Sequence, residues 1–199
     1  MFPLLRRTDE ERLSHIYITM RDFRMVALLG MMMLYYPIRV LLMMWLPEYT
    51  DSLMYMALLF PMCIYEGKMS LLINTYLKTL REEKAMLKVN LIALGFALIL
   101  TFITTILIED LNLAILSIMI LLVFRCISAE IYLSKIMNIS VFRDIILEII
   151  MTIIFILGGW FANPGMAVVI YAVSYIIYLF IKRKDIISTI NNIKLLLKA

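Results

Sequence analysis

Charged side chains inside two long apolar stretches, 53–77 and 111–133, are the residues of this sequence with the clearest capacity for chemistry. They are Glu66, Lys68, Arg125 and Glu130. A charge at the centre of a membrane helix costs about 2.5–3.5 kcal/mol on the insertion scale, so each needs a partner, a water-filled cavity or a function. Ion pairing, coupling to a proton or another ion, and contact with a charged substrate are the chemistry these residue types offer.

Two of these charges lie at the same depth in their stretches. Glu66 lies 13 residues after Leu53, and Arg125 lies 13 residues after Asn112. At the rise of a helix, both lie roughly 20 Å from the start of their stretches, in a hydrocarbon core of about 30 Å. We therefore expect an ion pair between Glu66 and Arg125, or a polar cavity that holds both. The alternative, in which each charge meets a different neighbour for stability only, stays open.

Arg39 is a further cation inside an apolar stretch, two residues after Pro37. Proline removes one backbone donor from the helix ladder, so a kink is expected there. The Arg39 side chain either extends along the helix to the outer interface or faces a cavity as a functional cation. Both interpretations stay open.

Glu148 is a further carboxylate inside an apolar stretch, about one and a half turns from the start of 142–161. Together with Glu66 and Glu130 it is a candidate for ion pairing, for a proton relay or for coupling to an ion. These carboxylates do not form a metal-ligand pattern, and no metal site or cofactor is expected.

Three tyrosines, Tyr171, Tyr175 and Tyr178, follow helical spacing on one face of the last apolar stretch. Aromatic side chains at this spacing are typical of packing against a neighbouring helix. A platform for a sugar ring is the second interpretation.

The stretches that position these residues are long and apolar enough to cross a membrane. The chain of 199 residues is 64% hydrophobic, whereas soluble domains are about 45–50% apolar. Lipid offers no partner to backbone groups, so each stretch is expected to be a helix. The sequence thus predicts an all-α, polytopic transmembrane helical bundle over 25–181. The six expected spans are 25–46, 53–77, 89–108, 111–133, 142–161 and 166–181.

Lys and Arg residues gather at alternate ends of these spans, whereas the connections 47–52, 109–110 and 162–165 contain none. By the positive-inside rule, both termini are expected in the cytoplasm. Residues 1–24 are expected to form an amphipathic leader helix on the cytoplasmic face. Residues 182–199 are expected to form a basic amphipathic tail that favours anionic lipid.

Motifs of the common enzyme classes do not occur in the sequence, neither a phosphate-binding loop nor a zinc-protease or nucleophile-elbow motif. Cys63 and Cys126 lie inside spans, and the only histidine, His15, lies in the leader, so a cysteine nucleophile would lack a histidine base. The cysteines are interpreted as small apolar residues. We expect no enzyme activity and no nucleic-acid partner.

The sequence resembles the C-terminal part of the Wzx-like oligosaccharide and polysaccharide flippases, of the superfamily that also includes the lipid II flippase and the multidrug exporters. Three segments carry this resemblance. They are the opening MFPLLRRTDEER, the outer turn WLPEYTDSL, and the run ALLFPMCIYEGKMSLLINTYLKTLREEKAML, residues 57–87, which ends in a charged run similar to that of the family. The likeness is most specific over residues 44–86.

The resemblance implies a transporter that moves a lipid-linked oligosaccharide, such as a polysaccharide, O-antigen or teichoic-type precursor, across the cytoplasmic membrane. Members of the family have twelve or fourteen helices in two lobes, so this chain is expected to be a C-terminal portion. A missing N-terminal lobe or a second copy would complete it. Arg39 and Arg125 are then expected to contact the diphosphate, and Glu66 to position Arg125 or to couple an ion.

Two other functions compete with transport. A small structural or regulatory membrane subunit would use the polar faces of its helices to dock on a partner. An intramembrane acid–base enzyme would use Glu66, Glu130 or Glu148.

Overall fold

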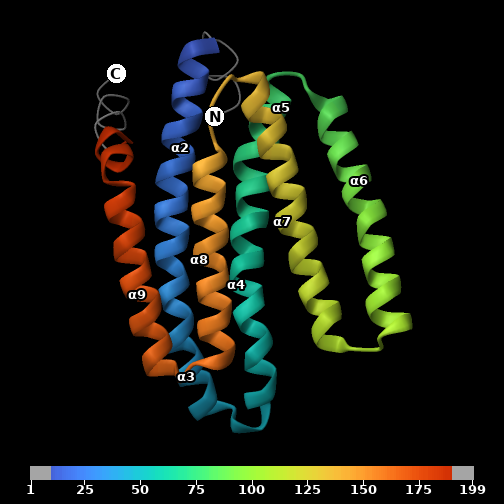
Figure 1. Ribbon diagram of the computed structural model, residues 1–199, viewed down its shortest axis with the longest axis vertical. Helices are drawn as coiled ribbons and strands as arrows, with labels where there is room; N and C mark the ends of the chain where they lie inside the picture. The colour runs from blue at the N-terminus through green and yellow to red at the C-terminus, as the bar shows by residue number, and fades with distance from the viewer. Residues whose placement is uncertain (1–9, 190–199) are drawn as a thin grey trace. The chain divides into compact units, whose positions relative to one another are not determined.

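The computed structural model describes residues 10–189 (Figure 1), which form helices with short connections and contain no strand. The α-helices are α2 (Glu10–Met31), α3 (Tyr35–Trp45), α4 (Leu53–Lys68), α5 (Asn74–Thr79), α6 (Glu83–Phe102), α7 (Leu111–Ile136), α8 (Phe142–Phe161) and α9 (Pro164–Ile181). Two 3-10 segments, η1 (Met32–Leu34) and η2 (Pro47–Ser52), and two π-helical segments, η3 (Met69–Ile73) and η4 (Ile103–Leu107), continue or connect them.

The prediction of an all-α bundle with six spans is confirmed. Six helical runs within residues 10–189 are long and apolar enough to cross a membrane. They are Leu13–Trp45, Tyr55–Thr79, Glu83–Leu107, Asn112–Ile136, Phe142–Phe161 and Pro164–Ile181. The fifth agrees with the expected span at both ends. The first run starts twelve residues earlier than expected and the third six residues earlier, and the other ends agree to within three residues.

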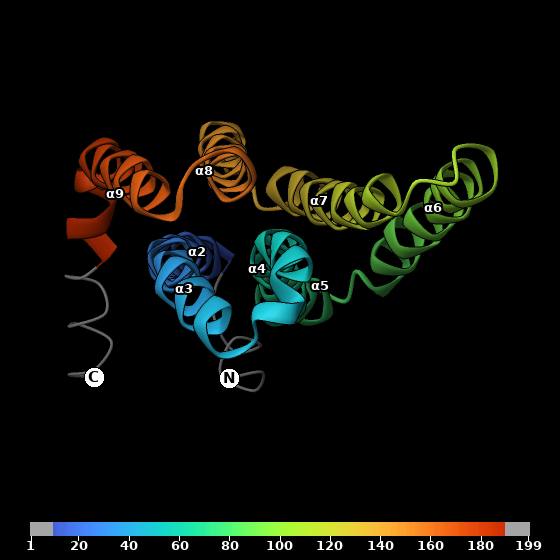
Figure 2. The same cartoon turned by 90° about the horizontal axis from the view of Figure 1, so that it is seen from below.

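The described residues divide into two compact units. Unit 1 contains residues 61–142, and unit 2 contains residues 10–60 and 143–189. In unit 1, α6 and α7 form an antiparallel pair joined by a tight turn, and α7 also packs on η3 (Figure 1). In unit 2, α9 packs along α2 and α3. Figure 2 shows the same helices nearly end on.

The chain does not divide at residue 24 into a leader and a first span, as the sequence had suggested. Helix α2 runs without a break from Glu10 to Met31, and apolar residues on one face of it are buried on both sides of that position. These are Leu13, Tyr17, Met25 and Leu29. The charged residues that suggested a surface helix include Arg21 and Asp22, and both are buried with charged partners.

Only part of each expected terminal segment is described. Residues 1–9 of the leader and 190–199 of the tail lie outside the described residues. After a turn at Lys182, residues 183–189 continue as a helix. Lys182 itself is buried and paired, whereas Arg183 and Lys184 are exposed.

The irregularity expected in the helix at Pro37 appears as a 3-10 segment one turn earlier in the chain. Residues Met32–Leu34 form a 3-10 segment between α2 and α3. Pro37 has no N–H to donate to the carbonyl of Met33, and its ring crowds that carbonyl, so the ladder changes its spacing there. The run from α2 to α3 is therefore one span with an irregular turn in its second half.

Tyrosines of α9 hold it against α2 through backbone carbonyls. The Tyr171 hydroxyl donates to the carbonyl of Leu29 at 2.8 Å, and the Tyr175 hydroxyl donates to the carbonyl of Val26 at 2.8 Å. Gly30 leaves room for this approach, because a Cβ there would lie 2.9 Å from the Tyr175 hydroxyl oxygen. The packing interpretation of the α9 tyrosines is thus confirmed for these two.

A glycine of α8 allows close packing between helices in unit 2. A Cβ on Gly159 would lie 2.9 Å from the Cβ of Ala57 in α4 and 3.5 Å from the hydroxyl oxygen of Tyr35. Small residues at helix contacts let backbones approach inside a membrane, where dispersion and hydrogen bonding replace the hydrophobic effect.

Replacing this glycine is expected to weaken unit 2. Gly159→Ala should lower the free energy of unfolding by about 1–3 kcal/mol, because the added methyl group overfills the contact with Ala57. Unfolding in detergent micelles measures the change. Gly165→Ala is the matched control, since a Cβ at Gly165 meets nothing within 4 Å. Equal losses in the two variants would contradict the packing argument.

Candidate functional site

A buried ion pair joins α4 to α7 in unit 1. The Lys68 ammonium lies 2.6 Å from a carboxylate oxygen of Glu130, and the two side chains are 2% and 0% exposed. Lys68 is the last residue of α4, and η3 begins at the next residue. Because burial strips both groups of water, their mutual attraction and hydrogen bonding must offset a large desolvation cost.

A second, more open ion pair lies in the same unit. Arg125 Nη1 is 3.6 Å from Glu66 Oε2, with the side chains 26% and 50% exposed. Arg125 also donates from Nε to the side-chain oxygen of Asn90 in α6, at 2.9 Å. The predicted contact between Glu66 and Arg125 is therefore confirmed. The distance is that of an ion pair and longer than an ordinary hydrogen bond.

The acidic and basic residues of the two pairs follow one another in opposite order on α4 and α7. On α4 the acid, Glu66, precedes the base, Lys68, whereas on α7 the base, Arg125, precedes the acid, Glu130. A shift of one helix along the other would bring like charges together. The four charges therefore fix the register of α4 against α7, at the middle of both spans.

A groove of about 600 Å³ opens beside the more exposed pair. Its walls are mainly apolar, and it also exposes the Glu66 carboxylate and the Cys63 thiol. The lining residues are Met62, Cys63, Glu66, Gly67, Ser70, Leu71 and Leu122. This volume is within the range of small-molecule sites, and a charged residue among apolar ones is typical of sites that orient a ligand.

The buried carboxylates of unit 2 form a separate cluster, in which α2, α8 and the end of α9 meet. The Lys182 ammonium lies 2.9 Å from Asp22 and 2.7 Å from Asp144, and Arg21 pairs with both carboxylates. At its edge, Asp185 accepts from Arg143 at 2.8 Å and lies 3.4 Å from Lys182. Cations and carboxylates are balanced here, so the cluster fastens three helices without a net charge.

Sequence reasoning had not identified this cluster. Arg21, Lys182 and Arg143 had been counted only as flanking charges that orient the spans. The overlooked signal is an adjacent pair of opposite charges, Arg21 and Asp22, in a helix that is otherwise apolar on that face. Glu148 is buried one turn deeper in α8 than Asp144 and belongs to unit 2, whereas Glu66 and Glu130 belong to unit 1.

Arg39 has a protein partner in unit 2. Its Nη1 donates to the carbonyl of Gly159 at 2.6 Å, and its guanidinium carbon lies 6.0 Å from the centre of the Tyr35 ring. Gly159 is in the last turn of α8, where carbonyls lack partners in their own helix and carry partial negative charge. The structure thus supports a role for Arg39 at the end of α8. Contact with a substrate stays a prediction.

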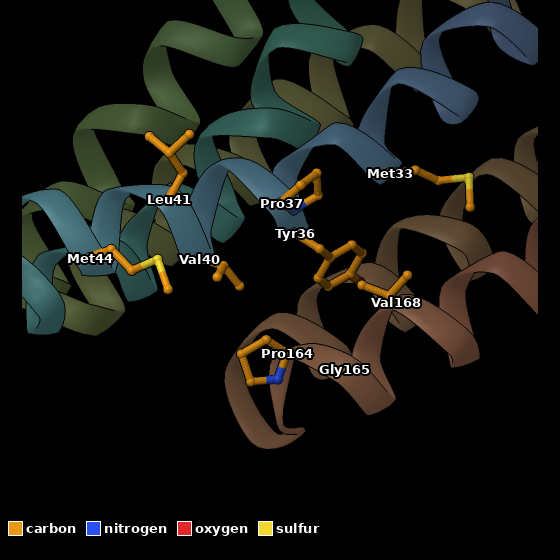
Figure 3. A pocket seen from close by; sticks show the side chains of 9 residues that line it. All are labelled: Met33, Tyr36, Pro37, Val40, Leu41, Met44, Pro164, Gly165 and Val168. Carbon is orange, nitrogen blue, oxygen red and sulfur yellow. The ribbon is translucent and has the colours of Figure 1, made fainter.

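A second apolar groove, also of about 600 Å³, lies in unit 2 between α3 and the start of α9 (Figure 3). Tyr36 links it to a cluster of aromatic rings in the interior, where neighbouring ring centres are 5.1–6.4 Å apart. The groove is lined by Met33, Tyr36, Pro37, Val40, Leu41, Met44, Pro164, Gly165 and Val168. It contains no charged side chain, in contrast to the groove at Glu66.

The comparisons with known proteins leave the family open. The chain matches no family model, no curated protein sequence and no solved structure. The resemblance to the oligosaccharide flippases therefore stays a prediction. The candidate site is defined by its geometry alone. It consists of the partly exposed pair Arg125 and Glu66 in mid-span, the mainly apolar groove beside Glu66, and the buried pair Lys68 and Glu130 nearby.

Proposed function

We propose that this chain is part of a membrane transporter that moves an amphiphilic, phosphate-bearing substrate of the lipid-linked oligosaccharide class across the cytoplasmic membrane. The observation that carries the proposal is the setting of Arg125. It lies in the middle of a span, a quarter of its side chain is exposed, and its contact with Glu66 is a loose one. A guanidinium in this setting can exchange one carboxylate for the oxygens of a phosphate.

The neighbouring residues support the same function. The side-chain oxygen of Asn90, in α6, accepts a hydrogen bond from Arg125 Nε. The two terminal nitrogens of Arg125 therefore stay available to bind anions. Glu66 serves as an internal counter-ion when no phosphate is present, so that the cation is never left alone in the membrane. The groove beside Glu66 offers an apolar wall to the lipid part of the substrate.

Transport also requires two alternating states, which helical transporters achieve by rocking two bundles about a site near the midplane. In our proposal a second copy of the chain supplies the opposing half. Arg39 is a less direct candidate for substrate contact, because it already binds the carbonyl of Gly159.

Docking of a partner is the second candidate function, and the half-exposed carboxylate of Glu66 favours it. A carboxylate exposed in mid-span must face water or another protein. A regulatory or structural subunit would bury Glu66 against a basic or hydrogen-bonding residue of its partner. Such a subunit would not move lipid by itself.

A flipping assay separates the two functions. The full chain is reconstituted in vesicles that contain a fluorescent undecaprenyl-diphosphate oligosaccharide, and the label in the outer leaflet is quenched over time. Arg125→Gln is expected to slow flipping at least tenfold, because the diphosphate loses its cationic partner. Arg183→Gln is the control, since Arg183 is exposed beyond α9. Equal flipping by Arg125→Gln and wild type would exclude the transport proposal, and so would a wild-type protein that does not flip the lipid.

A further inference from the structure

We propose that the groove at Glu66 in unit 1 binds a lipid whose head carries both a phosphate and an ammonium group, as in phosphatidylethanolamine. The phosphate would bind Arg125, the ammonium would bind Glu66, and a hydrocarbon chain would lie along the apolar wall of the groove. This inference rests on the proposed function for the entry of an amphiphile at this depth. It adds a second occupant of the site, a membrane lipid with a single phosphate, which binds when the transported diphosphate does not.

The charges of the site favour a zwitterion over a head that has one phosphate and no ammonium. Arg125 Nη1 and Glu66 Oε2 are 3.6 Å apart, and both side chains are partly exposed. A head with a single phosphate and no ammonium that replaced Glu66 on Arg125 would leave the Glu66 carboxylate without a cation, and a purely cationic head would leave the guanidinium without an anion. A head with both charges a few ångströms apart replaces the internal ion pair by two intermolecular pairs, so neither charge is left uncompensated.

The residues that line the groove suit an intact lipid better than a soluble head group. Glu66 is the charged residue of the lining, and Met62, Leu71 and Leu122 supply apolar walls. Burial of a hydrocarbon chain against such walls supplies binding energy that a free phosphoethanolamine lacks. The occupant is therefore expected to be the intact lipid.

Gly67 gives this proposal a direct steric test. It lines the groove, and a Cβ on it would meet nothing within 4 Å. The backbone therefore has room for a side chain here, and a leucine is expected to extend into the groove. Gly95, in α6 of the same unit, is a matched control, because a Cβ there also meets nothing within 4 Å and the residue lies outside the groove.

The two cysteines allow occupancy of the groove and folding of the protein to be measured by thiol labelling. Cys63 is exposed and lines the groove, whereas Cys126 is buried in α7. A bound lipid should cover the Cys63 thiol and slow its reaction with a maleimide. Cys126 should stay unlabelled while the protein is folded, so it reports the integrity of each variant in the same experiment.

The experiment measures the labelling rate of Cys63 in the full chain, in dodecyl maltoside micelles, with added lipid. Phosphatidylethanolamine is expected to slow labelling at least fivefold, whereas phosphatidylglycerol and free phosphoethanolamine change it less than twofold. Gly67→Leu should abolish the slowing and Gly95→Leu should retain it. Glu66→Gln should remove the preference for phosphatidylethanolamine over phosphatidylglycerol, because the ammonium loses its partner.

Three outcomes would overturn the proposal: equal protection by phosphatidylglycerol in the wild type, protection by free phosphoethanolamine alone, or full protection that survives in folded Gly67→Leu. The Glu66→Gln comparison decides the question if Gly67→Leu exposes Cys126. Flipping is not measured here, so the two proposals fail separately. Selective protection without flipping contradicts only the transport proposal, and flipping without selective protection contradicts only the lipid site.

Discussion

Lys68→Met is expected to lower the free energy of unfolding by about 3–5 kcal/mol, because it leaves the Glu130 carboxylate buried without its cation. Glu130 is fully buried, so it gains little compensation from water. Unfolding of the full chain in mixed micelles, followed as loss of helical signal, measures the effect. The loss is a large fraction of the stability of a typical domain, about 5–15 kcal/mol.

The double variant Lys68→Met with Glu130→Leu separates the pair from its parts. Because neither charge remains to be desolvated, its stability is expected to equal or exceed that of the wild type. Lys78→Met is the matched control for loss of a lysine, since Lys78 is exposed on α5, and its effect should be small. A double variant as unstable as Lys68→Met alone would show that the pair is not the source of the loss.

Lys182→Met is expected to lower the stability of unit 2 by about 3–5 kcal/mol as well. Its ammonium lies within 3 Å of two buried carboxylates, those of Asp22 and Asp144. Without it, Arg21 is the remaining buried cation of the cluster for both of them. With Arg21 as their buried cation and the exposed Arg143 3.9 Å from Asp144, the two carboxylates are under-compensated and repel each other, so the packing of α2, α8 and α9 should weaken at this end.

Lys184→Met is the control for this variant. It removes the same charge two residues later in the chain, from an exposed position. Both variants change the count of basic residues after α9 equally, so any effect on orientation in the membrane is the same. The difference in unfolding free energy between them is the measured quantity. A difference below about 1 kcal/mol, the usual worth of an exposed pair, would contradict the role of the buried cluster.

The spans of this protein were predictable from sequence because lipid imposes one requirement on every one of them. A membrane helix needs about twenty apolar residues whatever it packs against. The expected span 142–161 therefore coincides with helix α8 at both ends, and the uncharged residues 89–108 are mostly exposed. Helix α2 begins before the expected start of the first span, and Arg21 and Asp22 within it are buried and paired.

The partner of a charged residue was predictable from sequence only where both residues lie at the same depth in their spans. Counting residues along two helices matched Glu66 with Arg125. The same count did not assign Lys68 to Glu130, because the choice depends on which way each side chain turns about its helix. No periodicity in a single sequence fixes that angle. The cluster at Lys182 joins residues over 120 positions apart and lay beyond such counting.

The π-helical segment η3 also sets how this protein tolerates changes in length. Buried residues recur in pairs every four positions from here, at Lys68 and Met69, Leu72 and Ile73, Tyr76 and Leu77. In a regular α-helix a four-residue repeat drifts by about 40° per step, and the wider π turn takes up that drift. Loss of one residue within Met69–Ile73 would turn everything beyond it by about 100°. Homologous sequences should therefore vary freely in residue type on the exposed side of this helix, whereas insertions and deletions should be confined to its ends.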